Sequence, residues 1–113
     1  MKTAELTGAA LDWAVAKCEG KNGVLHDDGI TRCIVIASES GVYKGTWKPS
    51  TNWAQGGPII EREKIGLLPS GNAYYERDGG TQYSYGDTSL IAAMRCYVAL
   101  KLGDNVEIPE ELK

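Results

Sequence analysis

The sequence contains no phenylalanine, only one histidine and no long apolar run. None of its apolar runs approaches the ~18 residues that a membrane-spanning helix needs. Its first residues are polar and charged and do not form the apolar core of a signal peptide. We therefore expect neither membrane insertion nor secretion. A nucleophilic serine or cysteine needs an activating base, so a single histidine also argues against nucleophilic catalysis.

Spacings that would hold a metal ion are missing as well. The three cysteines stand far apart, with no CxxC or CxxH pair among them: Cys18, Cys33 and Cys96. Zinc binding is therefore not expected, and this cysteine usage fits a reducing cytoplasm. His26 is followed by Asp27 and Asp28, but three adjacent positions cannot all converge on one ion. We predict a solvated loop at residues 21–29.

Positive charge is not in excess. The chain has 12 Lys and Arg against 15 Asp and Glu, a formal net charge of -3. Binding to a phosphate backbone needs a broad positive field, so nucleic acid is not an expected partner. At 113 residues the chain has the usual size of one domain and no room for a second. We predict a single domain over residues 1–113.

Apolar residues at helical spacing predict two main helices. Thr7 is placed to cap the first, which runs to about Cys18. Asp87 or Thr88 caps the second, which continues to Leu102 and ends at Gly103. The residues of the second helix that should be buried are Leu90, Ile91, Met94 and Val98.

Short strands are predicted between these helices. Residues 30–37 are rich in β-branched side chains and predict a buried strand, with residues 42–46 as its hairpin partner. Residues 65–68 and 73–77 predict a second hairpin, and residues 82–85 an edge strand. A short helix from after Pro49 to about Glu63 should be irregular, because Gly56, Gly57 and Pro58 would interrupt it.

The order of these elements predicts an α+β fold. Two amphipathic helices and a small antiparallel sheet bury their apolar faces best when they pack in layers, as in an α-β-α sandwich. Two helices cannot fully cover a sheet of four or five strands, and several Trp and Tyr compete for the remaining cover. We therefore predict a homodimer whose interface includes part of residues 47–60.

Residues 46–63 are the most informative segment, because they combine two Trp, two Pro and two Gly with short polar side chains. The residues predicted to form a binding site are Trp47, Ser50, Thr51, Asn52, Trp53, Gln55 and Arg62. The rings could stack on a ligand and the amides and hydroxyls could orient it. Arg62 or Arg95 could bind a phosphate. The alternative is a packed loop that fixes the short helix to the sheet.

Catalytic residues are not predicted. Glu61 and Glu63 are the best candidates for a general base, but nothing in the sequence gives either carboxylate a raised pKa. A non-enzymatic protein that binds another protein is the favoured function. The alternative is a protein that sequesters a small nucleotide-like signal. No cofactor is expected.

Three stretches of the sequence carry a resemblance to a known family: ELTGAALDWAVAKCEG, PSTNWAQGGPIIEREKI and TSLIAAMRCYVALKLGDNVEIPEEL. Together they cover more than half of the chain. They resemble the NinX-like group of small phage and prophage proteins of unknown function, whose plan is similar to the phage α-β-α sandwich domain. The resemblance implies a phage origin, a compact α+β fold and residence in the cytoplasm of the infected cell. It supplies no reaction and no catalytic residues. With the phage origin that the resemblance implies, the favoured function is a phage accessory protein that binds a host or phage protein. The alternative is a sponge that sequesters a nucleotide-like signal of bacterial antiphage defence.

Overall fold

The computed structural model describes residues 1–38, 40, 43–77 and 79–113. Over these residues the elements follow one another as η1 (Thr3–Glu5), α1 (Gly8–Cys18), β1 (Asn22–Asp27), β2 (Arg32–Ala37), β3 (Tyr43–Trp47), α2 (Trp53–Glu63), β4 (Gly66–Leu67), β5 (Ala73–Arg77), β6 (Gly80–Ser84), α3 (Ser89–Leu102) and η2 (Glu110–Leu112). The predicted α+β class is confirmed.

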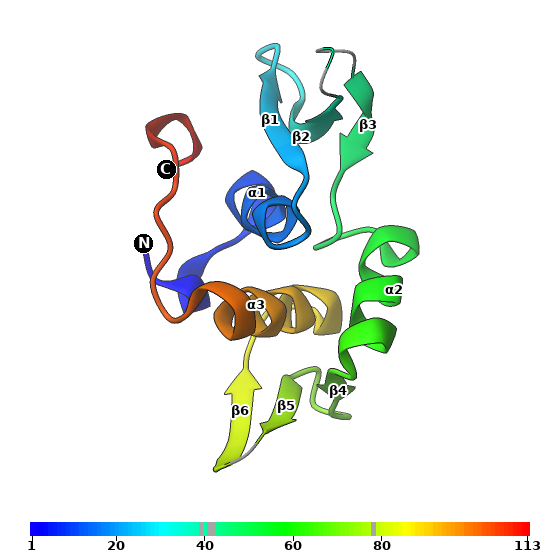
Figure 1. The fold of residues 1–113 in the computed structure, drawn as a ribbon, viewed down its shortest axis with the longest axis vertical. Helices are drawn as coiled ribbons and strands as arrows, with labels where there is room; N and C mark the ends of the chain where they lie inside the picture. Colours follow the sequence, from blue (N-terminus) through cyan, green and yellow to red (C-terminus); the bar gives the residue numbers. More distant parts are fainter. Residues whose placement is uncertain (39, 41–42, 78) are drawn as a thin grey trace.

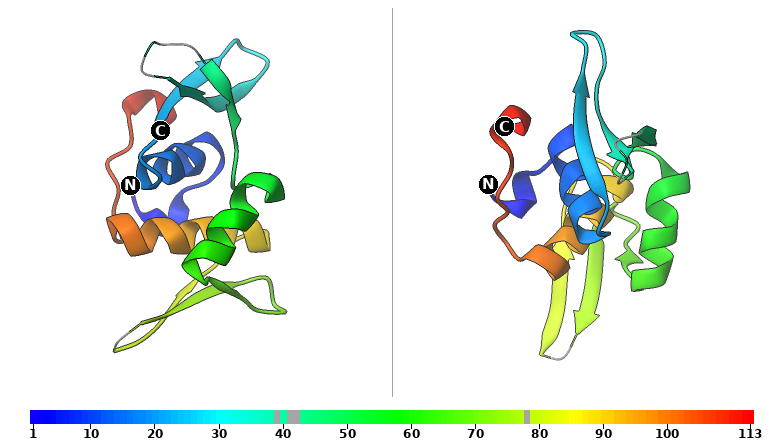
Figure 2. Two further views of the ribbon diagram at one scale, coloured as in Figure 1. Left: turned by 45° about the vertical axis from the view of Figure 1, so that its right-hand side comes forward. Right: turned by 45° about the horizontal axis from the view of Figure 1, so that its top comes forward.

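The strands form two small antiparallel sheets, in the orders β1-β2-β3 and β4-β5-β6. These sheets lie at opposite ends of the molecule, with α1 and α3 between them and α2 along one side (Figures 1 and 2). The order of the layers therefore differs from the prediction. The sequence suggested a single sheet, whereas the structure has two sheets with the helices between them. Each sheet is built from strands that are neighbours in the chain, so each forms locally and packs onto the helices separately.

The segment at residues 21–29, predicted to be a loop, is largely strand β1, and that prediction was wrong. Its apolar residues Val24 and Leu25 lie opposite Val35 and Ile34 of β2. These cross-strand pairs stabilise the strand in spite of the turn-forming residues around them.

The turn between β1 and β2 occupies residues 28–31, so it comes later in the chain and is shorter than the predicted loop at residues 21–29. The Asp28 carboxylate accepts hydrogen bonds from the backbone N–H groups of Ile30 at 2.9 Å and Thr31 at 2.6 Å. Ile30 was predicted to begin a buried strand, but it lies in this turn and is 95% exposed. Of the predicted turn at residues 38–41, residues 39 and 41 lie outside the described residues.

The two main helices begin and end at the predicted residues, although the Thr7 side chain makes no capping hydrogen bond at the start of α1. Thr88 Oγ1 accepts a hydrogen bond from the N–H of Ile91 at 3.1 Å and caps α3, and Gly103 follows its last residue. Of the residues expected to be buried in α3, Ile91 alone is only half-buried. Helices α1 and α3 pack against each other. The core residues that they contribute include four alanines and four larger apolar residues, namely Ala10, Leu11, Ala14, Val15, Ala92, Ala93, Met94 and Val98. Small side chains such as alanine leave room for helices to pack closely.

Helix α2 is continuous, although interruption by its glycines and proline was expected. Asn52 caps it by accepting a hydrogen bond from the Ala54 N–H at 2.8 Å, and Lys64 ends it with a left-handed φ of 57°. A Cβ at Gly56 would lie 2.4 Å from the Pro49 carbonyl oxygen and 2.6 Å from Leu90 Cδ1. Glycine is therefore required here because α2 seats closely against its neighbours, and its effect on helix propensity is secondary.

The two ends of the chain are tied together. Lys2 forms an antiparallel bridge with Asn105, and Thr3 Oγ1 donates a hydrogen bond to the Gly103 carbonyl oxygen at 2.6 Å. The C-terminal tail, residues 104–113, was expected either to fray or to dock through its apolar residues. It docks, because its three apolar anchors are at most 5% exposed: Val106, Ile108 and Leu112.

Candidate functional site

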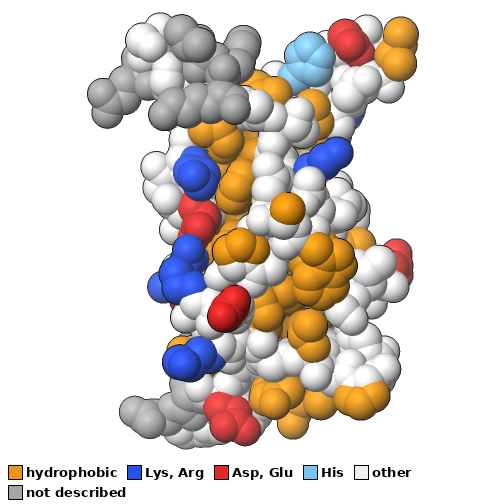
Figure 3. Space-filling model, turned by 90° about the vertical axis from the view of Figure 1, so that its right-hand side faces the viewer, with side chains coloured by type: hydrophobic (Ala, Val, Ile, Leu, Met, Phe, Trp, Pro, Cys, Tyr) orange, Lys and Arg blue, Asp and Glu red, His pale blue; other side chains and the backbone are white. Residues whose placement is uncertain are grey.

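The two tryptophans of the predicted site lie in different environments. Trp47 is 9% exposed and belongs to the core, with the Lys21 ammonium 5.2 Å from its ring centroid. Trp53, the first residue of α2, is 53% exposed. The face of the molecule that carries α2 displays a group of apolar side chains (Figure 3). Trp53 can therefore contact a partner, whereas Trp47 mainly supports the fold.

The two amides of the predicted site bind the protein's own backbone. Asn52 caps α2, as described above. The Gln55 carboxamide accepts a hydrogen bond from the Lys48 N–H at 2.7 Å and donates one to the Thr46 carbonyl oxygen at 2.8 Å. These contacts join the start of α2 to the end of β3. They are the contacts of a packed loop, which was the alternative considered for this segment.

Arg62 lies in an ion-pair cluster that joins the three helices. Its guanidinium donates to the two carboxylate oxygens of Glu19 at 3.1 and 2.6 Å and to Glu63 at 2.8 Å. The Tyr97 hydroxyl donates to the same Glu19 carboxylate at 2.5 Å. Burial raises the pKa of Glu19, but the hydrogen bonds from Arg62 and Tyr97 outweigh it and leave that pKa below its ordinary value. Arg62 therefore acts in the fold as a clamp.

Ser50 anchors the same segment to α1. Its backbone N–H donates a hydrogen bond at 2.9 Å to the carboxylate of Asp12, which is only 5% exposed. Burial raises the pKa of Asp12 to about 6, although hydrogen bonding by Ser50 and the charge of Lys48 oppose the rise. Ser50, Thr51 and Trp53 also line a shallow hollow of about 370 Å³ beside the start of α3. A binding role for the predicted residues stays a prediction.

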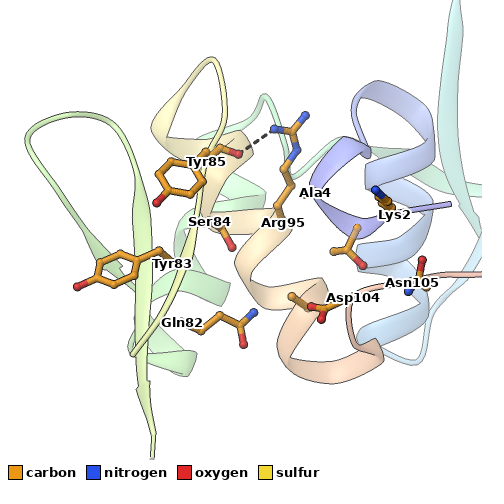
Figure 4. A pocket seen from close by; sticks show the side chains of 11 residues that line it. Lys2, Ala4, Gln82, Tyr83, Ser84, Tyr85, Arg95, Asp104 and Asn105 are labelled. Atoms are coloured by element: carbon orange, nitrogen blue, oxygen red, sulfur yellow. Dashed lines mark hydrogen bonds between the residues drawn. The ribbon is translucent and has the colours of Figure 1, made fainter. Parts of the chain in front are cut away.

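A second cavity, of about 410 Å³, lies on another part of the surface (Figure 4). We call it the β6 cleft. It runs between β6, the start of the chain, α3 and the start of the C-terminal tail. Its lining residues are Lys2, Thr3, Ala4, Gln82, Tyr83, Ser84, Tyr85, Arg95, Ala99, Asp104 and Asn105. The cleft combines a strand edge, two cationic side chains and one carboxylate.

Arg95 is held in a fixed position in the β6 cleft. Its Nε donates a hydrogen bond to the Leu6 carbonyl oxygen at 2.7 Å, and one terminal nitrogen donates to the Tyr85 carbonyl oxygen at 2.8 Å. Arg95 forms no salt bridge with any residue that the structure describes. A guanidinium has five N–H groups, so donors remain after these two bonds. The arrangement can bind a carboxylate or a phosphate with little loss of side-chain entropy.

A comparison with known protein families shows which family this chain belongs to. The family described as bacteriophage P22 NinX matches residues 2–101, which is most of the sequence. The chain belongs to the NinX family. The predicted family resemblance is thereby confirmed, and the match runs from Lys2, the first lining residue of the β6 cleft, to Lys101 near the end of α3. No curated protein matches this NinX-family chain.

Most of the residues that line the β6 cleft were not predicted from the sequence. Of these residues, only Arg95 was considered, as one of two arginines that could bind a phosphate. One signal was present, because Arg95 lies in the middle of an otherwise apolar stretch of α3, SLIAAMRCYVAL. A charged residue in such a helix must find polar partners or a cavity. Its partners come from the start of the chain and from the end of β6, and the sequence does not show that these meet.

Two further expectations concern ions and membranes. Among the residues that the structure describes, no three His, Cys, Asp or Glu side chains are grouped as metal ligands would be. Over the same residues, no helix of this NinX-family protein is long and apolar enough to cross a membrane.

Proposed function

We propose that this NinX-family protein is a non-enzymatic phage accessory protein that binds a host or phage protein in the cytoplasm of the infected bacterium, and that the β6 cleft is the binding site. The observation that carries the proposal is Arg95, a fixed cation without a carboxylate partner among the described residues, beside the open edge of β6. A protein surface provides both the carboxylates and the extended segments that such a site would bind.

The exposed residues around the cleft support a protein partner. Tyr83 is 54% exposed and Tyr85 is 64% exposed. In Figure 4 both side chains project from the side of β6 opposite to Gln82 and Ser84, so they border the cleft without filling it. Tyrosine and arginine are enriched at protein interfaces, where they act as anchors with a polar end.

Capture of the partner tests the proposal. The protein should carry its affinity tag after Lys113, because the α-amino group of Met1 donates a hydrogen bond to the Val106 carbonyl oxygen. From phage-infected cells we expect a specific protein to be enriched. Arg95→Lys keeps the charge but loses the planar fork, and it should lower the affinity for that protein about tenfold, or about 1.4 kcal/mol.

Trp53→Ala is the matched control, because it removes an exposed ring from the predicted site on another part of the surface. If Trp53→Ala loses the partner and Arg95→Lys retains it, binding belongs to the segment predicted from the sequence. If no protein is enriched over an unrelated tagged protein, the proposed function is wrong.

A small nucleotide-like ligand is the second candidate function. The β6 cleft, at about 410 Å³, falls within the range of roughly 300–1,000 Å³ that is usual for ligand sites. Arg95 and Lys2 could bind a phosphate there, and Gln82 and Asn105 could contact a base edge. The sequence placed this ligand between Trp47 and Trp53, but the burial of Trp47 favours the cleft.

Thermal unfolding in the presence of single nucleotides and cyclic dinucleotides tests this second candidate. A ligand at about 100 times its dissociation constant stabilises a protein by about 2.7 kcal/mol. For a domain of this size, that raises Tm by roughly 10 °C or more. The increase should shrink in Arg95→Lys and persist in Trp53→Ala. An unchanged Tm with every nucleotide would remove this candidate.

Catalysis is not part of the proposal. Glu63, one of the two candidate bases, accepts a hydrogen bond from Arg62 and lies 3.5 Å from the Lys101 ammonium. The hydrogen bond from Arg62 lowers the pKa of Glu63, which weakens it as a base near neutral pH. The homodimer also stays a prediction. The core position of Trp47 leaves Trp53 as the main exposed aromatic residue of residues 47–60.

A further inference from the structure

We propose that the partner of the β6 cleft binds as an extended peptide segment that pairs with the free edge of β6 as a fourth strand and places a carboxylate against Arg95. This inference rests on the proposed function and names the kind of partner segment that the cleft fits. The carboxylate can be the C-terminus of the partner or an Asp or Glu side chain, and the experiment below separates the two.

The free edge of β6 is identified by its backbone. Strand β6 is the last strand in the order β4-β5-β6, so one of its edges pairs with β5 and the other does not. The Tyr85 carbonyl oxygen points to Arg95, which lines the cleft on the unpaired side (Figure 4). In an extended chain, alternate residues direct their N–H and C=O to the same edge. Tyr83 and Thr81 therefore present their backbone groups toward the cleft side, as Tyr85 does.

The shape of the β6 cleft favours a strand over a helix. One wall is β6, and the opposite wall contains the bridge between Lys2 and Asn105, which is also extended backbone. A helix satisfies its own backbone hydrogen bonds and would leave the edge of β6 unpaired. An extended segment would pair with that edge, and its alternate side chains would lie beside the exposed rings of Tyr83 and Tyr85.

The charges of the cleft favour a carboxylate on the bound segment. Arg95 and Lys2 both line it, and neither forms a salt bridge with a described residue, whereas Asp104 is the one acidic residue in the lining. Hydrogen bonds to Leu6 and Tyr85 fix the guanidinium of Arg95 at the end of β6. A carboxylate there would form charge-assisted hydrogen bonds with the remaining N–H groups and would set the register of the added strand.

Binding of a random library of nine-residue synthetic peptides tests the inference, with one copy of the library carrying free C-terminal carboxylates and a second copy carrying amidated C-termini. We expect enrichment of extended sequences with an acidic group near one end. Enrichment only in the free-carboxylate library identifies the C-terminus as the ligand, and enrichment in both libraries of peptides with Asp or Glu identifies a side chain. Arg95→Gln should weaken the selected peptides at least about tenfold.

Strand pairing is tested separately from charge. Tyr83→Pro removes the N–H that faces the cleft, and proline is tolerated at a free strand edge. Tyr83→Ala is the matched control, because it removes the same ring but keeps the N–H. We expect Tyr83→Pro to lower peptide affinity about tenfold or more relative to Tyr83→Ala. In the unmodified protein, the Tyr83 amide should exchange its hydrogen more slowly when peptide is bound, a measurement that does not depend on the folding of either variant.

Two results would overturn the inference. One is the absence of any peptide that binds at micromolar concentration. The other is a set of peptides whose binding is equal in Tyr83→Pro and Tyr83→Ala and leaves the exchange of the Tyr83 amide unchanged. If a partner protein is nevertheless captured from infected cells and lost in Arg95→Lys, the proposed function stands and only the strand-pairing mode is wrong.

Discussion

Gly56→Ala is expected to destabilise the protein by about 2 kcal/mol, although alanine is the better helix former. The added methyl group would lie 2.4 Å from the Pro49 carbonyl oxygen and 2.6 Å from Leu90 Cδ1. The first of these atoms belongs to the backbone and cannot rotate away. Overpacking of this kind costs about 1–3 kcal/mol or more, and the gain of about 1 kcal/mol in helix propensity offsets only part of it. Unfolding in guanidinium chloride measures the change.

The neighbouring Gly57 provides the matched control. A Cβ there would have its nearest contact at 4.0 Å, with Cε3 of Trp53, and therefore has space. Gly57→Ala should stabilise the protein by about 0.5–1 kcal/mol through helix propensity and the lower entropy of the unfolded chain. Alanine substitutions at these two adjacent glycines of one helix should thus change the free energy of unfolding in opposite directions. Equal stabilisation by both substitutions would show that α2 does not seat against Pro49 and α3 as described.

The second large effect is a dependence of stability on pH that arises from Asp12. Its pKa is raised from 3.8 to about 6, mainly by burial. A carboxylate with a raised pKa binds its proton more tightly in the folded state. Its contribution to stability is fully present below pH 3.8 and is lost as the pH rises through 6. One pKa unit corresponds to about 1.36 kcal/mol, so the charge on Asp12 costs about 3 kcal/mol at pH 8.

Asp12→Asn isolates this contribution. Asparagine keeps an oxygen that can accept the Ser50 N–H but carries no charge at any pH. The free energy of unfolding of the variant, minus that of the unmodified protein, should increase by about 2.4 kcal/mol between pH 4 and pH 8, because a small part of the total effect already occurs below pH 4. Other carboxylates, such as Glu19, have lowered pKa values and act in the opposite direction, but they are common to both proteins and cancel. A difference that does not change with pH would contradict the burial of an ionised Asp12.

The helices were predictable from local signals, and the layering was not. Thr88 caps the start of α3 and Gly103 follows its last residue, as the local sequence signals predict. The spacing of Leu90, Met94 and Val98 matches one buried face of the helix. Nothing local shows whether consecutive hairpins join into one sheet, because that depends on which face of a helix each hairpin covers. The glycines of α2 were misread for the same reason. At Gly56 the cause is close packing against the Pro49 carbonyl oxygen and against Leu90, which is distant in the sequence.

The candidate site was predictable only in its residue types. Sequence patterns singled out Gln55 and Arg62 as groups that could bind a ligand, but those groups bind Thr46, Lys48 and Glu19 within the protein itself. Polar side chains that satisfy buried or half-buried partners look the same in a sequence as those that bind ligands. The β6 cleft, in contrast, collects residues as far apart in the chain as Lys2 and Asn105 and leaves no local pattern.

The bridge between Lys2 and Asn105 gives the β6 cleft an order of assembly. During synthesis the N-terminal segment emerges long before α3 and the residues that follow it. The wall that contains the bridge therefore cannot form until the residues around Asn105 have been made. Closure of such a long loop is entropically costly, and the bridging contacts should form late in folding. A nascent or truncated chain that ends before residue 103 would display β6 without the opposite wall. Such a chain would offer a bare strand edge that is open to aggregation, and the proposed partner recognition would be reserved for the finished fold.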